Sequence, residues 1–254
     1  MIRGTDYGEE MSARRPPLAR VWMLLAAAAV AGATFVSSAA LAAKGAPPAT
    51  ARDLAQLYFA SGLVRAEVVS LVGRVEHDYR VDVGRVVAVR ANAVDLLEKD
   101  GTRQTIAIGA QTLVVGVGRL FAPGTISKGT RVVTVRDGNA PAQQVRPATW
   151  ARVLGKMLFG GTLVRAEVLN YAGKTLHDYR IDEGRIVGVK PASITLAERD
   201  GSRQTIQVSA STLVSVGSQV VDQSAVVKGL TALTVREGDG PAEQIMLSAL
   251  VVGR

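Results

Sequence analysis

Residues 63–89 read LVRAEVVSLVGRVEHDYRVDVGRVVAV, and residues 163–189 read LVRAEVLNYAGKTLHDYRIDEGRIVGV. Apolar and polar side chains alternate along most of both stretches, and a glycine, Gly73 or Gly173, interrupts the alternation. Alternation with a period of two is typical of β-strands, and a glycine between two such runs predicts a tight turn. The stretch therefore predicts a β-hairpin that occurs twice in the chain.

The duplication extends well beyond this hairpin. Without any gap, 41 of the 100 residues from 51 to 150 are identical to the residue one hundred positions later. We call residues 51–150 copy 1 and residues 151–250 copy 2, and we expect two similar domains. The expected division is 1–43 signal peptide or membrane anchor, 44–62 linker and short helix, 63–147 first β-domain, 148–162 linker helix and 163–254 second β-domain.

The composition narrows the classes of protein. The chain has 254 residues, of which 48% are hydrophobic and only 4% aromatic, and it has no cysteine. The apolar content suffices for packed cores. The few aromatic residues argue against base-stacking modules, and we therefore expect no nucleic-acid partner. The lack of cysteine excludes disulfides, thiolate metal sites and cysteine nucleophiles.

The N-terminal residues resemble a targeting sequence. Arg14, Arg15 and Arg20 precede an uncharged run from Val21 to Ala43, in which Ala40–Ala42 fit small-residue cleavage chemistry. The run is also long enough to cross a bilayer, so both a cleaved signal peptide and an uncleaved anchor at residues 21–43 stay open. Either predicts an exported, extracytoplasmic protein, because the basic residues lie before the run.

The net charge of the chain is +8, and the part after residue 43 has 26 basic and 19 acidic residues, a net charge of +7. The two signs are interspersed, which indicates a mixed, solvated surface. A weak attraction to an anionic envelope polymer or lipid headgroup, or a protein partner, is consistent with this charge. If residues 21–43 are not cleaved, this segment would also contact the membrane.

Beyond the hairpin, each copy is expected to be mostly strand. Turn signals occur at Asp100-Gly101 and Lys128-Gly129, between the strand candidates of residues 93–99, 102–108, 112–117 and 130–138. Residues 51–62 and 148–161 have helical spacing and end in glycine, and we expect them to plug an open barrel end. The predicted fold is all-β: two tandem small antiparallel β-barrel-like domains, each opened by a short helix, after an N-terminal signal or anchor helix.

The runs GRVVAV, KDGTRQTIAIGAQTLV and ISKGTRVVTVRDG, with their counterparts GRIVGV and VVKGLTALTVREG, resemble the exported bacterial domain-of-unknown-function family numbered 5666. The resemblance covers about 60 residues of each copy and leaves the opening hairpin outside. It implies a small β-barrel-like fold and an envelope location. It implies no catalytic residue.

The two HDYR segments contain the only histidines. In a strand, His77 and Tyr79 share one face and Asp78 and Arg80 the other, and the same holds in copy 2 for His177 and Tyr179. We expect each His and Tyr to form a hydrogen-bonded pair at the rim of the core, and Asp78, Arg80 and Asp82 to form a surface ion-pair row. The alternative is a metal or catalytic site, if the two histidines met and Glu67 and Glu167 added oxygen ligands.

Arginines recur at the same positions of the two copies: Arg65, Arg85, Arg103 and Arg136, with Arg165, Arg185, Arg203 and Arg236. They either pair with interleaved acids or line a groove for a polyanion. As ligand-binding candidates the sequence offers His77, Tyr79, His177, Tyr179, Arg85 and Arg185. It predicts a non-enzymatic binding or scaffolding module, without catalytic residues, metal or cofactor; an enzyme or metal protein using the histidines and an electrostatic binder of anionic cell-wall polymers are the alternatives.

Overall fold

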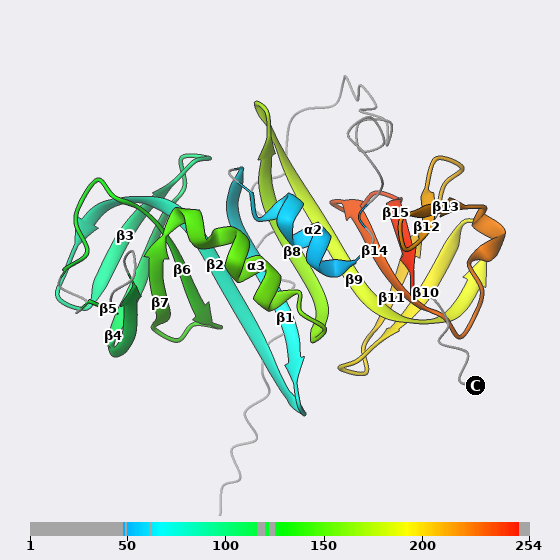
Figure 1. Ribbon diagram of the computed structural model, residues 1–254, viewed down its shortest axis with the longest axis horizontal. Helices are drawn as coiled ribbons and strands as arrows, with labels where there is room; N and C mark the ends of the chain where they lie inside the picture. The colour runs from blue at the N-terminus through cyan, green and yellow to red at the C-terminus, as the bar shows by residue number, and fades with distance from the viewer. Residues whose placement is uncertain (1–47, 49, 61, 116–119, 122–124, 249–254) are drawn as a thin grey trace, which may run out of the picture. The chain divides into compact units, whose positions relative to one another are not determined.

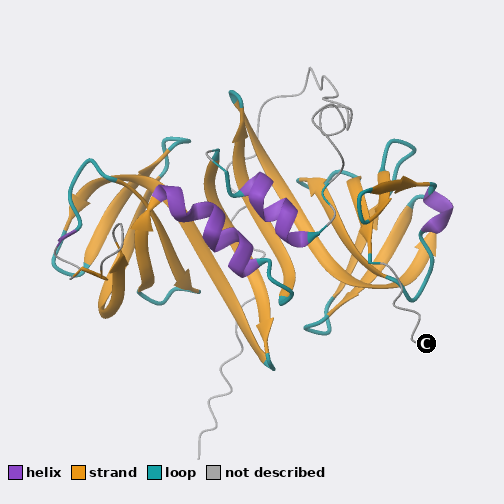
Figure 2. Ribbon diagram, in the orientation of Figure 1, coloured by secondary structure: helices purple, strands orange, loops and turns teal. Residues whose placement is uncertain are grey.

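The computed structural model describes residues 48, 50–60, 62–115, 120–121 and 125–248. The expected signal peptide or anchor, residues 1–43, lies outside this range. Within the described residues, no helix is long and apolar enough to cross a membrane. Strands dominate the described part, so the all-β prediction is confirmed (Figures 1 and 2).

The two copies contain corresponding elements, except that one long strand of copy 1, β4 (Arg103–Val115), corresponds to two strands in copy 2. Copy 1 consists of helix α2 (Ala51–Tyr58), strands β1 (Leu63–Val72), β2 (Val75–Val89), β3 (Ala93–Glu98), β4 (Arg103–Val115), β5 (Leu120–Phe121), β6 (Arg131–Asp137) and β7 (Ala142–Pro147), and the 3₁₀ turn η3 (Ala148–Trp150). Copy 2 consists of α3 (Ala151–Leu158), β8 (Leu163–Ala172), β9 (Thr175–Lys190), β10 (Ser193–Glu198), β11 (Arg203–Gln207), β12 (Leu213–Val216), β13 (Gln219–Val221), η4 (Gln223–Ala225), β14 (Thr231–Glu237) and β15 (Ala242–Leu247).

The opening hairpin is present in both copies, with Gly73 and Gly173 at φ 66° in its turns. Strand β2 continues through Gly84 to Val89. Its first half pairs with β1 and its second half with β3 along the same edge. A Cβ atom on Gly84 would lie 3.0 Å from the carbonyl oxygen of Leu97, so glycine permits the close approach where β2 changes partners.

Strand pairing in copy 1 returns to its starting point. β2 pairs with β3, β3 with β4, β4 with β7, β7 with β6, and β6 with the free edge of β2. The β4–β7 pair is parallel, as is its counterpart β12–β15. The expectation of purely antiparallel domains is therefore wrong. β7 pairs antiparallel with β6 on one side, and this orientation makes it run in the same direction as β4 on the other.

A threonine marks the bend of this path in each copy. The Thr112 hydroxyl donates to the carbonyl oxygen of Ala142 at 2.5 Å and accepts from the Gly109 amide at 2.9 Å. Thr212 makes the corresponding bonds to Ala242 and Ser209. The hydroxyl thus satisfies two backbone groups at the place where the strand turns from one partner to the next.

The two copies are joined through their first strands. β1 pairs antiparallel with β8, so the central strand order is β9-β8-β1-β2, and all strands of the described residues belong to one sheet. Glu67 and Glu167 lie directly opposite each other at the middle of this pair. The copies therefore share a continuous backbone ladder in addition to the linker between them.

Helices α2 and α3 contact each other and cover one face of the central strands (Figure 1). Phe59 and Phe159, one at the end of each helix, meet edge to face with ring centroids 5.5 Å apart. Both belong to a core that also contains Val68 of copy 1 and Val168 of copy 2. The expectation that each helix plugs a barrel end is wrong, because the largest apolar surface is the joint between the copies, and the helices bury it.

Each helix is also bound to the strand of the other copy. The Asn170 amide on β8 donates to the carbonyl oxygen of Tyr58 in α2, and the Ser70 hydroxyl on β1 donates to that of Leu158 in α3 at 3.4 Å. Two further cores lie inside the pairing paths, around Leu96 and Ile106 in copy 1 and around Leu196 and Ile206 in copy 2.

Candidate functional site

The histidine of copy 1 interacts with an acid that the sequence pattern did not single out. His77 Nδ1 lies 2.6 Å from Asp137 Oδ2, and the other carboxylate oxygen accepts from the Asp78 amide at 3.0 Å. The His77 ring stacks on Tyr79 at 5.3 Å between centroids. Burial, followed by the nearby Asp137 carboxylate, raises the pKa of Tyr79. The histidine and tyrosine share a face as predicted, but they stack, and the hydrogen bond goes to the acid.

Copy 2 repeats the arrangement in a more enclosed form. His177 Nδ1 lies 2.9 Å from Glu237 Oε1, and its ring stacks on Tyr179 at 5.5 Å. Tyr179 also contacts Tyr58 of α2, with ring centroids 4.5 Å apart. Burial, and then the charge of Glu243 and Glu237, raises the pKa of Tyr179 to about 12. Its hydroxyl therefore stays protonated at physiological pH.

The two histidines do not meet. The row of paired residues through His77 crosses β1 at Ser70 and β8 at Leu163, whereas His177 pairs with Asn170, at the other end of β8. Strand geometry separates them by roughly 14 Å across the sheet and about 23 Å along it. Within the described residues, no group of three or more His, Asp or Glu side chains is arranged to hold a metal ion. The geometry does not support a metal site shared by the two copies.

The opposite face of the central strands carries charges in rows. Arg180, Glu167, Glu67 and Arg80 follow one another across β9, β8, β1 and β2. Arg80 Nε lies 3.5 Å from Glu67 Oε1, and a second nitrogen of Arg80 lies 3.6 Å from Asp78. The predicted ion-pair row is thus present in part. Asp82 departs from it, because this side chain is buried and pairs with Arg136 at 3.4 Å.

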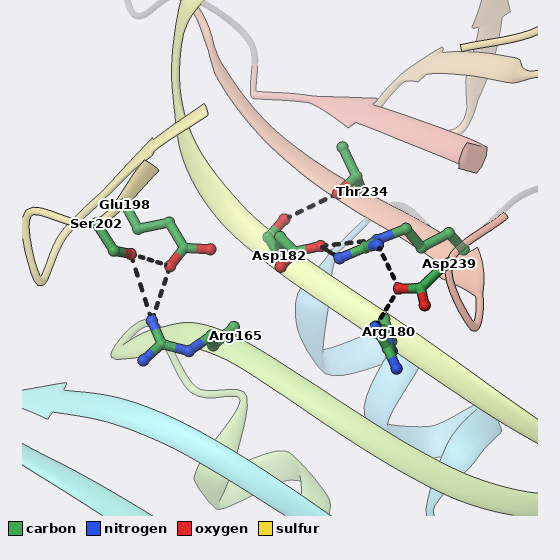
Figure 3. A network of polar contacts seen from close by, with 8 residues as sticks. Arg165, Arg180, Asp182, Glu198, Ser202, Thr234 and Asp239 are labelled. Atoms are coloured by element: carbon green, nitrogen blue, oxygen red, sulfur yellow. Dashed lines mark hydrogen bonds and ion pairs between the residues drawn. The ribbon is translucent and has the colours of Figure 1, made fainter. Parts of the chain in front are cut away.

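Asp82 belongs to a buried cluster of arginines and carboxylates that both copies contain. In copy 2, a nitrogen of Arg165 lies 2.9 Å from Glu198, and Ser202 donates to Glu198 at 2.5 Å (Figure 3). The same nitrogen of Arg165 lies 2.5 Å from Asp200. Asp182 pairs with Arg236 at 3.3 Å on the next strand, and Thr234 donates to the Asp182 backbone carbonyl (Figure 3). In copy 1, the same interactions join Arg65 to Glu98 and Asp100, and Arg136 to Asp82.

Burial raises the pKa of carboxyl groups in these clusters. The Glu98 side chain has no solvent exposure, and this burial raises its pKa to about 8 although Arg65 acts in the opposite direction. Burial also raises the pKa of Glu198, which Ser202 and Arg165 counteract. The clusters bind the beginning of β1 or β8 to the following hairpin, which indicates a structural role. The repeated E-x-D-G at residues 98–101 and 198–201 is the sequence signal for them.

The repeated arginines therefore divide into two groups. Those at 65, 136, 165 and 236 pair with acids, as the simpler of the two sequence interpretations holds. Arg85 lies directly opposite Arg131 on β6, and opposite Leu97 on β3, whose other neighbour is Arg103 on β4. We call Arg131, Arg85 and Arg103 the arginine row. All three are exposed, and no described acid lies within ion-pair distance of any of them.

In copy 2, the arginine row is less complete. Arg185 lies opposite Thr231, and Arg203 follows beyond Ala197. Glu183, two residues before Arg185, pairs with Arg199 at 3.0 Å, whereas Val83 occupies the corresponding position of copy 1. The arginine row of copy 1 thus carries more positive charge than the corresponding positions of copy 2, where an acid also lies nearby.

A cavity of about 380 Å³ lies beside the arginine row, between the ends of β4 and β7 and the start of β6. Val114, Ile126 and Val145 form part of its apolar wall, and Arg131 and Arg146 lie among the polar residues that line it. In copy 2, Thr231 and Met246 stand at the positions of Arg131 and Arg146. The two arginines that line the cavity are therefore specific to copy 1.

No protein-family model, no curated protein and no solved structure matches this chain. The resemblance to the family numbered 5666 stays a prediction.

Proposed function

We propose that the chain is an exported, extracytoplasmic and non-enzymatic binding or scaffolding module of the cell envelope. The joint between the copies supports this proposal: β1 and β8 pair, and one core with residues of both copies lies beneath the helices. Such a construction holds two similar surfaces at a fixed spacing, which suits a scaffold or a two-point binder.

We further propose that each copy is a small barrel, as the resemblance to the family numbered 5666 implies. The closed pairing path from β2 back to β2 supports this in copy 1. In copy 2, residues 208–212 connect β11 to β12 at the bend that the continuous strand β4 makes in copy 1. Closure removes exposed strand edges, which would favour a monomeric protein in the envelope.

The ligand class that the geometry supports best is an anionic envelope polymer. The observation behind this is the direct opposition of Arg85 and Arg131 on paired strands. Like charges that face each other destabilise a sheet, and here no described acid compensates them. A polyanion with charges along an extended chain would relieve this repulsion and span the arginine row to Arg103.

Retention of the full chain on isolated cell-wall sacculi, and on dextran sulfate as a soluble polyanion, tests the proposal. The double variant Arg85→Gln/Arg131→Thr, which introduces the copy 2 residue at 131, should release at clearly lower salt than the wild type. The matched control Arg185→Gln/Arg203→Gln removes the same charge from copy 2 and should change release far less. Equal release of both variants would contradict a specific role of the arginine row.

One observation favours a second candidate function, a metal or catalytic role of the histidines. In both copies a carboxylate oxygen lies within hydrogen-bond distance of Nδ1, an arrangement that also orients metal-binding histidines so that the other ring nitrogen meets the metal. Metal analysis of the purified chain, with His77→Ala and His177→Ala, distinguishes the two functions. Stoichiometric metal that is lost in the variants would favour this second candidate; loss of thermal stability without metal would indicate a purely structural role.

A further inference from the structure

The outer faces of α2 and α3 carry an apolar surface that the described part of the fold leaves uncovered. Leu57 is 46% exposed on α2, and Val153 and Met157 are 42% and 64% exposed on α3. Both helices lie side by side over the central strands (Figures 1 and 2). Exposed apolar side chains that gather on one face of a protein mark an interaction site. We call Leu57, Val153 and Met157 the helix-pair surface.

The charged side chains beside this surface are mostly basic. Arg52 on α2 and Arg152 and Lys156 on α3 are exposed, and no described acid pairs with any of the three. The acid of α2, Asp53, accepts a hydrogen bond from the Thr50 hydroxyl at the helix start. Helices that lie in a bilayer interface typically have exposed apolar side chains flanked by basic residues. The apolar side chains enter the interface, and the basic residues bind anionic headgroups.

The duplication places these features symmetrically. Arg52 corresponds to Arg152, and Leu57 corresponds to Met157, so both copies have an arginine at the second helical position and a long apolar side chain at the seventh. Both sets lie on the same side of the central sheet, because both helices contribute to the one core above it. Two such helices form a broader contact than one, with apolar side chains from both.

The position of the helix pair along the chain identifies the surface it would meet. Helix α2 begins at Ala51, only eight residues after the uncharged run that ends at Ala43. Eight extended residues reach at most about 29 Å, so a chain held in a bilayer by residues 21–43 keeps α2 within that distance of the lipid headgroups. We propose that the helix-pair surface docks on the outer face of an anionic lipid bilayer, with Leu57, Val153 and Met157 in the interface.

This docking goes beyond the proposed polymer binding, because it uses other residues and stands or fails separately. It orients the chain: the helices face the membrane, and the charged rows around Glu67 face away from it. The absence of cysteine allows a direct test, since a single introduced cysteine is the only site for a thiol-reactive label.

The test uses the full chain in vesicles of phosphatidylglycerol and phosphatidylcholine. An environment-sensitive fluorophore on Leu57→Cys or Met157→Cys should shift to the blue and be quenched by nitroxide-labelled lipid. The same fluorophore on Glu67→Cys, on the opposite face of the central strands, should keep the emission of a water-exposed probe. Charge reversal by Arg152→Glu/Lys156→Glu should reduce quenching at residue 57 several-fold.

The matched control for charge is Arg74→Glu/Lys174→Glu, which makes the same change of net charge in the exposed hairpin turns and should leave quenching intact. The proposal is overturned if probes at residues 57 and 157 stay as exposed to water as the probe at 67. It is also overturned if quenching is equal in phosphatidylcholine alone, or if only added envelope proteins, and not vesicles, protect the two helix probes.

Discussion

Glu67 and Glu167 lie directly opposite each other on β1 and β8. On either side of them the register is symmetric, with Ala66 opposite Val168 and Val68 opposite Ala166. Since residues one hundred positions apart are equivalent, the pairing relates the copies by an approximate two-fold axis between the two glutamates. The crossed hydrogen bonds from the strands to the helices follow the same symmetry. The chain is thus built as a two-fold dimer within one polypeptide.

This symmetry predicts the behaviour of a single copy. A fragment of residues 148–248 has its own helix and first strand but only half of the central core. We expect it to form a homodimer through β8–β8 pairing, because a monomer would expose that half-core and the edge of β8. Analytical ultracentrifugation of the fragment checks this. A stably folded monomer at micromolar concentration would argue against a core that depends on both copies.

The buried carboxyl of Glu98 predicts a decrease in stability with rising pH. Its pKa is about 8 when folded, above the usual value of 4.5, so the folded state holds this proton more tightly than the unfolded state. The contribution of this protonated carboxyl to the free energy of unfolding is complete below about pH 4.5, declines between about pH 4.5 and 8, and is lost above that. We expect Glu98→Gln to flatten this part of the profile, as measured by thermal denaturation at several pH values. An unchanged slope would mean that Glu98 is ionised in the folded state.

The two helix bonds predict unequal effects of their removal. Asn170 is buried, and Asn170→Ala leaves the Tyr58 carbonyl without this donor, which should cost about 1–3 kcal/mol in the free energy of unfolding. The Ser70 bond is long at 3.4 Å, so Ser70→Ala should cost about 0.5 kcal/mol or less. Urea denaturation of both variants gives the comparison, and a larger loss for Ser70→Ala would refute it.

The close approach at the bend of β9 predicts an intolerance of alanine. A Cβ atom at residue 184 would lie 2.7 Å from the carbonyl oxygen of Ala197, whereas one at residue 109 would lie 3.4 Å from Pro141. We expect Gly184→Ala to destabilise the fold by about 1–3 kcal/mol, since backbone must move, and Gly109→Ala to be nearly neutral. Thermal melts of the two variants provide the measurement; similar melting temperatures would show that the bend can relax.

Local features could be predicted from the sequence. The turns at Gly73 and Gly101, the alternation of His77 with Asp78 and the duplication all follow from short-range rules of backbone geometry and side-chain period. The parallel β4–β7 pair could not, because nothing near either strand specifies which distant edge it will meet. The β1–β8 joint and the acid partner of His77, sixty residues away, are long-range contacts of the same kind.

An assembly of identical subunits changes all its equivalent sites with every mutation. Here each half of the two-fold arrangement is encoded separately, so a substitution alters one side and leaves its counterpart as it was. Arg131 and Thr231, or Val83 and Glu183, are such differences between equivalent positions. The joint at Glu67 and Glu167 holds the two copies together, and residues away from this joint can change in one copy alone.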